Sequence, residues 1–160
     1  MTPIQALQAA TINSAALKEP VLISDCAKVF GSQAIVASVD YKTQDDDQFV
    51  WTDFGKTRTQ HRLLDWVRVV EDQGAGEILL TDIDRDGSAQ GYDLETIDRV
   101  ANAVSIPVIA CSGAGHQRHF LSCFENTGAS AVAAGNIFHF TENAYPRAKT
   151  FLRSKLADIR

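Results

Sequence analysis

The sequence lacks most features of secreted, membrane or nucleic-acid-binding proteins. Its three cysteines, Cys26, Cys111 and Cys123, are odd in number, lie far apart and lack paired metal spacing, so we expect reduced thiols rather than disulfides or a zinc site. No apolar run approaches the roughly 18 residues of a membrane span, and the first residues do not resemble a secretory signal. The net charge of −5 forms no basic stripe. These absences predict a cytoplasmic protein that binds neither membrane nor nucleic acid.

The chain does contain a recurring unit of apolar strand, polar loop, amphipathic helix and small-residue turn. Its 160 residues, 45% of them hydrophobic, suffice for one core, and no change in composition divides them. Alternation of strands and helices favours a parallel sheet with right-handed crossovers. The predicted strands are 11–13, 34–40, 77–83, 107–111 and 131–137; the predicted helices are 20–30, 63–73, 94–104, 117–126 and 145–157.

Residues 42–62 interrupt this alternation. Phe49, Val50 and Trp51 suit a small hairpin that turns at residues 53–56. Long loops in compact domains are often functional, which favours an active-site flap, and a surface hairpin without a role is the alternative.

The segment 74–93 joins a buried strand to a polar loop. The apolar residues 78–80 predict the strand, and four ionisable residues follow it: Asp82, Asp84, Arg85 and Asp86. Gly87 then permits a backbone turn. A loop of this kind is typical of a functional site, and a solvated turn that caps the next helix is the alternative.

Two further loops consist of small residues. Residues 111–115 (CSGAG) and 134–136 (AGN) each follow a predicted strand and lead toward a helix. Small residues let backbone N–H groups approach an anion, and (β/α)8 barrels often bind phosphate with the loops after strands seven and eight. Each loop alone is equally compatible with a simple turn.

Several segments together resemble the cyclase subunit of imidazole glycerol phosphate synthase, a (β/α)8 TIM-barrel family of histidine biosynthesis with relatives in surface-sugar amidation. The matching segments are TINSAAL, FGSQAIVASVDYK, GAGEILLTDIDRDG with GYD, IPVIACSGAG and FHF, in the family's order. They begin at the family's fourth strand. The resemblance therefore implies an α/β fold that is roughly the C-terminal half barrel, about strands 4–8. Residues 1–160 would form one partial barrel domain with a hairpin-like flap at about 42–62.

The resemblance also implies roles for individual residues. Asp40 stands where the family has its second catalytic aspartate, a general acid/base; a structural aspartate at a strand end is the alternative. Thr81 and Asp82 would face the substrate, and Glu77 matches a charged residue where ammonia enters, although Ala9 replaces its basic companion. Ser112 stands where the family usually has glycine. The implied substrate- and phosphate-binding residues are Asn13, Ser14, Thr81, Asp82, Asp86, Gly87, Ser112, Gly113, Gly135 and Asn136.

The family reaction joins ammonia to a doubly phosphorylated ribulosyl-formimino carboxamide ribonucleotide and needs no cofactor or metal. Implied partners are a glutaminase subunit and the phosphorylated substrate. In the family, the other catalytic aspartate lies at the end of the first strand, which is not among the matching segments. We therefore expect activity to be impaired or to depend on an N-terminal half-barrel chain or a homodimer. Two alternatives remain open: a non-catalytic half barrel that binds phosphate or a glutaminase, and an ammonia-dependent subunit for surface-sugar amidation.

Overall fold

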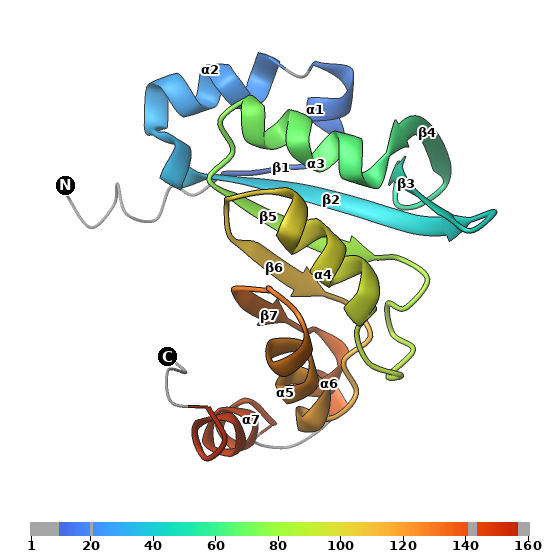
Figure 1. Cartoon of the computed structure of the whole chain (residues 1–160), viewed down its shortest axis with the longest axis vertical. Helices are drawn as coiled ribbons and strands as arrows, with labels where there is room; N and C mark the ends of the chain where they lie inside the picture. Colours follow the sequence, from blue (N-terminus) through green and yellow to red (C-terminus); the bar gives the residue numbers. More distant parts are fainter. Residues whose placement is uncertain (1–9, 20, 141–143, 157–160) are drawn as a thin grey trace.

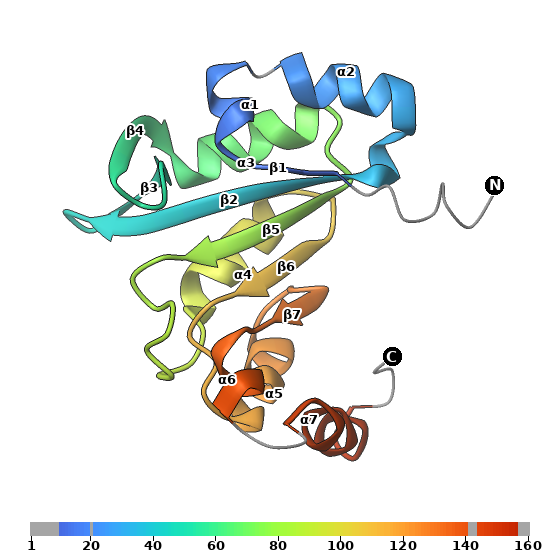
Figure 2. The same ribbon diagram turned by 180° about the vertical axis from the view of Figure 1, so that it is seen from behind.

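The computed structural model describes residues 10–19, 21–140 and 144–156. In this part of the chain, the strands form a seven-stranded sheet of order β4-β3-β2-β5-β6-β7, and β1 also pairs with β2. Helices α3, α4 and α5 cover one face of the sheet (Figure 1), and the opposite face is seen from behind (Figure 2). We call the helix-covered face the outer face and the opposite one the inner face.

The parallel strands follow one another across the sheet in chain order. They are β1 (Ala10–Ile12), β2 (Ile35–Gln44), β5 (Glu77–Asp82), β6 (Val108–Cys111) and β7 (Ala131–Ala133). Each pairs in parallel with the one before it. A doubly wound sheet reverses its order at a switch point, whereas a barrel adds strands in one direction. This order confirms the predicted partial (β/α) barrel.

The helices occupy the crossovers, largely as predicted. They are α1 (Ser14–Lys18), α2 (Val21–Phe30), α3 (Leu63–Asp72), α4 (Leu94–Ala103), α5 (Gln117–Asn126), α6 (Asn136–Phe140) and α7 (Ala144–Arg153), with a 3-10 turn η2 (Ser32–Ala34). The predicted ends at residues 20 and 157, and Ala9, lie outside the described residues. The short helix α1 was not predicted. The predicted strand 131–137 is wrong beyond Ala133, because the Phe138 N–H donates to the Gly135 carbonyl and begins a helical turn.

Strict alternation along β2 separates the two faces. Ile35, Ala37, Val39 and Tyr41 are buried beneath the helices, and the residues between them are only half-buried. The same alternation runs along β5 and β6. In-register pairing then assigns these side chains to the inner face: Thr11, Val36, Ser38, Asp40 and Lys42; Glu77, Leu79 and Thr81; Ile109 and Cys111; Ala131 and Ala133.

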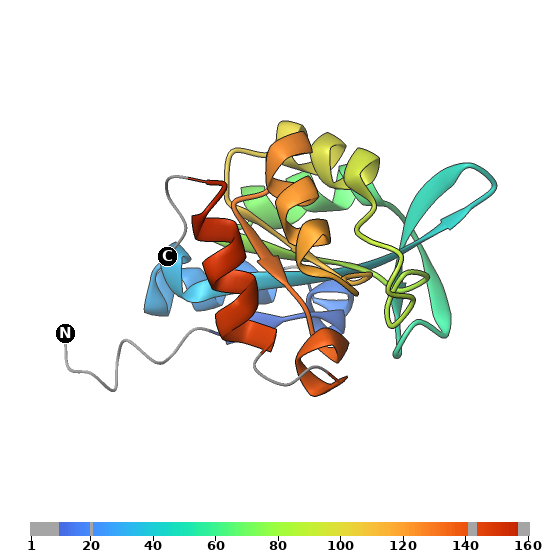
Figure 3. The same ribbon diagram turned by 90° about the horizontal axis from the view of Figure 1, so that it is seen from below.

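The predicted hairpin is confirmed. Strands β3 (Asp47–Thr52) and β4 (Thr57–Arg62) pair antiparallel around a turn at residues 53–56. The hairpin is not a separate insertion, however, because β2 runs past Asp40 to Gln44 and pairs with β3. Figure 3 shows this extension projecting beyond the body of the sheet. We call residues 41–62 the flap.

Two acidic side chains each connect a helix to the loop that follows the next helix of the chain. Glu71 at the end of α3 accepts hydrogen bonds from the Ser105 N–H (2.7 Å) and the Ser105 hydroxyl, in the loop before β6. Asp98 on α4 accepts from the Gly128 N–H (3.1 Å), in the loop before β7. The same device therefore recurs in two successive βα units.

We predict that the Glu71 bonds stabilise the fold only while the carboxyl is ionised. The bonds from Ser105 lower the pKa of Glu71 below its ordinary value of 4.5. Their contribution is complete above that value and is lost as the pH falls through the lowered pKa. Glu71→Ala should reduce the free energy of unfolding by about 0.5 kcal/mol at neutral pH, and the difference should narrow near pH 3. Denaturant unfolding at both pH values, with Glu125→Ala as an exposed control, measures this; a pH-independent difference would contradict it.

Candidate functional site

The candidate catalytic residue lies on the inner face near the carboxyl end of β2. Asp40 pairs in register with Thr81 on β5, which pairs with Cys111 on β6, which pairs with Ala133 on β7. These four side chains form one row across the inner face. All four residues are half-buried. The structure thus brings Asp40 and Thr81 together, and it adds Cys111, to which the sequence analysis gave no role.

Asp40 is held by the residues that follow β1. Asn13 Nδ2 donates to Asp40 Oδ2 at 2.9 Å and lies 3.3 Å from the hydroxyl of Ser38, which shares the inner face of β2. The Ser14 hydroxyl in turn donates to Asn13 Oδ1 at 3.3 Å. The predicted Asn13 and Ser14 therefore lie beside the predicted acid/base, where they fix the orientation of its carboxyl group.

Asp82 does not face the same side as Thr81, which corrects the expectation that both face the substrate. Successive residues of a strand point to opposite faces, and Asp82 is buried on the outer side. Its Oδ1 accepts from the N–H groups of Asp84 (3.0 Å) and Arg85 (3.3 Å), and Arg85 Nε lies 3.4 Å from its Oδ2. Burial raises the pKa of the Asp82 carboxyl, partly offset by these N–H donors. In this structure Asp82 shapes the loop that follows β5.

The loop after β5 packs closely against the loop after β6, and each contributes a glycine to the contact. The Gly91 N–H donates to the Gly113 carbonyl at 2.7 Å, and a Cβ on Gly113 would lie 2.2 Å from the Gly91 carbonyl oxygen. Gly113 also has a φ of +87°, which side chains disfavour. The same loop approaches α6, because a Cβ on Gly87 would lie 3.2 Å from Asn136 Nδ2. Gly87 and Asn136 are therefore neighbours, and Gly113 contacts the same loop at Gly91.

The Gly-Tyr-Asp segment after this loop fastens it to the rest of the sheet. The buried Tyr92 hydroxyl donates to the Ala133 carbonyl on β7 at 2.8 Å. Asp93 caps α4 by accepting from the Thr96 N–H, and it accepts from the Tyr41 hydroxyl at 3.2 Å. Burial, reinforced by Asp82 and Asp93, raises the pKa of Tyr41. The segment thus ties the loop to β7 and β2.

Ser112 and Cys111 occupy different environments. Ser112 is buried, has a φ of +86°, and its hydroxyl has no hydrogen-bond partner among the described residues. Cys111 is half-buried on the inner face, where burial, with a smaller contribution from the Asp86 charge, raises the pKa of its thiol. Asp86 itself is exposed in the loop that follows β5.

The remaining predicted residues lie at the two ends of the inner face. Gly135 has open space around its Cα, and Asn136 is exposed at the start of α6. Glu77 lies on the inner face at the other end of β5, about 13 Å from Thr81 along the strand.

Within the described ranges, no group of three or more His, Cys, Asp or Glu side chains is placed to hold a metal ion, and no helix has the length and apolar content to cross a membrane.

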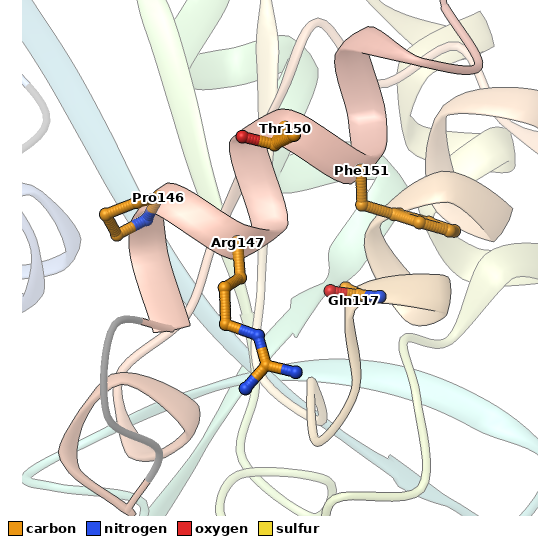
Figure 4. A pocket seen from close by; sticks show the side chains of 5 residues that line it. All are labelled: Gln117, Pro146, Arg147, Thr150 and Phe151. Atoms are coloured by element: carbon orange, nitrogen blue, oxygen red, sulfur yellow. The ribbon is translucent and has the colours of Figure 1, made fainter.

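A separate pocket of about 370 Å³ lies between α5 and α7. It is lined by Gln117, Pro146, Arg147, Thr150 and Phe151, and Figure 4 shows Phe151 reaching from α7 toward α5. None of the predicted site residues lines it. The pocket is therefore distinct from the row containing Asp40.

With this geometry established, known proteins identify the family. The family model described as "Histidine biosynthesis protein" matches residues 4–144. The chain belongs to this family. The (β/α)8 barrel expected from the sequence is the fold of the histidine biosynthesis family, and the sheet of this chain is part of one.

Individual family members are similar over nearly the whole chain. The imidazole glycerol phosphate synthase subunit HisF of Hydrogenobaculum sp. (strain Y04AAS1) is 46% identical over 151 residues, which cover 94% of this chain and 60% of that protein. The HisF subunits of Chlorobaculum parvum and Staphylococcus carnosus are 45% and 44% identical, with the same coverage. The predicted resemblance is confirmed. The chain spans about 60% of the length of these curated relatives.

Side chains on the inner face of β2 and β6 were missed by the sequence analysis. Ser38, Lys42 and Cys111 all belong to segments that resemble the family, and strand alternation alone would have placed them beside Asp40 and Thr81. Ser112 was chosen because it stands where the family usually has glycine, and Cys111, whose side chain lies in the inner row, was given no role. The alternation of side chains between the two faces of a strand was the signal in the sequence that could have identified these residues.

We predict that Ser112 is under backbone strain. A left-handed conformation costs a residue other than glycine about 1–3 kcal/mol, and an unpaired buried hydroxyl adds to that cost. Ser112→Ala removes only the hydroxyl, whereas Ser112→Gly also relieves the backbone. Thermal and denaturant unfolding should rank the glycine variant above the alanine variant by about 1 kcal/mol. A glycine variant no more stable than the alanine variant would show that the backbone is unstrained.

Proposed function

We propose that this chain provides the Asp40 half of a cyclase site of the imidazole glycerol phosphate synthase type. The substrates would be ammonia and a doubly phosphorylated ribulosyl-formimino carboxamide ribonucleotide, and the products imidazole glycerol phosphate, an aminoimidazole carboxamide ribonucleotide and water. The observation that carries the proposal is the inner row, in which an oriented carboxyl, a threonine and a thiol lie beside two glycine loops. Similarity to HisF subunits supports the same reading.

Asp40 would act as the general acid/base during ring closure. Its carboxyl is half-buried, oriented by Asn13 and open toward the inner side, so it can exchange a proton with a substrate lying across the strand ends. Thr81 would position the substrate next to it. No cofactor enters this chemistry, because proton transfer and addition of ammonia require only acid and base groups.

The loops after β5, β6 and β7 would hold one substrate phosphate. Gly87 and Gly135 are exposed and could offer backbone N–H groups beside Gly113, and Ser112 and Asn136 would supply polar side chains. Asn13 and Ser14, which follow β1, would belong to the opposite phosphate site. The unpaired Ser112 hydroxyl is a donor that a phosphate oxygen would satisfy. Asp86 would reach substrate hydroxyl groups rather than the phosphate, since two anions repel.

The inner face suggests how the site is completed. On strands β1, β2, β5, β6 and β7, the carboxylates of the inner face are Asp40 at one end and Glu77 at the other. In a mechanism with two carboxylates at the catalytic end, the second would come from residues outside this sequence: an N-terminal half barrel, in the same polypeptide or in a separate one, or another copy of this chain. Glu77 lies at the end of β5 opposite the catalytic row, where ammonia from a glutaminase partner would enter.

The single carboxylate at the catalytic end also supports a second candidate function. A half barrel that binds a phosphorylated ligand or a glutaminase without turnover would retain the glycine loops and would not need a second acid/base. A subunit for surface-sugar amidation would use the same row with ammonia. Product analysis with the ribulosyl substrate separates these possibilities.

We predict that Asp40→Asn lowers ammonia-dependent turnover by at least about a hundredfold, because the amide cannot exchange the proton. The assay follows conversion of the ribulosyl substrate by the purified chain, with solution mass recorded on the same sample. Asp72→Asn, an exposed residue at the end of α3, is the control and should retain full activity. Unchanged turnover in Asp40→Asn would exclude the assigned role. A folded parent chain without turnover would favour the binding half barrel.

A further inference from the structure

The flap continues the inner face beyond Asp40. Its other face is buried: Tyr41, Val50 and Thr52 are covered. Lys42 lies on the same side of β2 as Asp40, two residues further along. Lys42 pairs with Phe49 and Trp51 pairs with Arg58, so these four side chains share that side. We call them the cation–aromatic face.

Each cation of this face lies over a ring. Lys42 Nζ is 4.7 Å from the centroid of the Trp51 ring, and Arg58 Cζ is 3.9 Å from that of Phe49. Arg58 Nη1 also donates to Gln44 Oε1 at 3.1 Å, which keeps the guanidinium against the flap. Lys42, Phe49 and Trp51 are half-buried, and Arg58 is exposed. The face therefore presents flat rings and cations together.

The positive charge of this face is not neutralised by the flap's own carboxylates. In the described part of the chain, neither Lys42 nor Arg58 forms a salt bridge with a carboxylate. Asp47 pairs instead with Arg62 at 3.3 Å. The other acidic residues of the flap lie in its turns, at positions 45, 46 and 53. An anionic ligand would complement this charge.

Two further observations place the face at the site. A Cβ on Gly55 would lie 3.1 Å from Ile83 Cγ2 and 3.4 Å from Lys42 Cε, so the turn of the flap packs against the loop that contains Asp86 and Gly87. The Trp51 indole N–H is buried and has no acceptor among the described residues. An unpaired buried donor is costly, and an oxygen of a bound ligand would satisfy it.

We propose that the cation–aromatic face binds the planar heterocyclic end of a phosphorylated ligand. Lys42 and Arg58, which lie over the rings of Trp51 and Phe49, would move onto the phosphate of the ligand and uncover the rings, which would then stack on the heterocycle. The face thus selects nucleotides over simple sugar phosphates. This inference rests on the proposed function, since it assigns one end of the proposed substrate to the flap and leaves the other to the glycine loops.

Calorimetric titration of the full chain with two probes tests this assignment. Aminoimidazole carboxamide ribonucleotide carries a heterocycle, and ribose 5-phosphate has the same sugar and phosphate without it. The parent chain should prefer the nucleotide. Trp51→Leu should weaken nucleotide binding about tenfold and leave ribose 5-phosphate binding unchanged. Trp51→Phe, which keeps a ring, should restore most of the affinity.

Lys42 is tested in the same way. Lys42→Met keeps the aliphatic stem and removes the charge, and it should weaken binding of both probes about fivefold, whereas Lys42→Arg should rescue it. Lys56→Met, an exposed lysine in the turn of the flap, is the matched control and should bind like the parent chain.

The assignment would be overturned if the parent chain showed no preference for the nucleotide, or if Trp51→Leu kept the parent's affinity for the nucleotide. It would also be overturned if Trp51→Leu lost affinity for both probes equally while its circular dichroism and melting temperature matched the parent. If Trp51→Leu does not fold, Trp51→Phe and Lys42→Met carry the test. Nucleotide binding through the flap without turnover would overturn the cyclase proposal alone, and turnover with an unchanged KM in Trp51→Leu would overturn the flap assignment alone.

Discussion

The in-register pairing of β2 with β5 is the constraint on which the site depends. Because side chains alternate along each strand, this register places Asp40 beside Thr81 and sends Tyr41 and Asp82 to the other face. A slip of one residue would bury the Asp40 carboxyl under the helices and turn core side chains toward the inner face. The buried contact between Tyr41 and Asp93 opposes such a slip, since it fixes the end of β2 to the start of α4. Core packing and site geometry are therefore set by the same pairing.

Much of the fold could be predicted from the sequence, because the regular spacing of apolar residues outweighs the secondary-structure propensities of individual residues. The helix over residues 117–126 and the hairpin turn at 53–56 were predicted with their observed bounds. The end of β7 could not be read in this way, since Ile137 is as apolar in a helix as in a strand. The strained φ of Ser112 also has no local signal, because close contact between the Gly91 and Gly113 loops imposes that geometry.

The predicted site residues lie together where family segments coincide with strand ends, and the expected direction of a side chain was wrong where neighbouring residues were treated alike. Asp40, Asn13 and Thr81 do lie together, and Gly87 does approach Asn136. Asp82 was grouped with Thr81, although adjacent strand residues face opposite ways. Its oxygens instead organise the loop through Asp84 and Arg85, a role that depends on burial and not on residue type.

Glu71 accepts a hydrogen bond from Ser105, and Asp98 accepts one from Gly128. These bonds determine how many contacts would be lost if a βα unit were added or removed. Each bond joins one βα unit to the start of the next. Each unit is therefore stabilised by its immediate neighbours, as in repeat proteins. A unit added or removed at either end would disturb a single junction and leave the others intact.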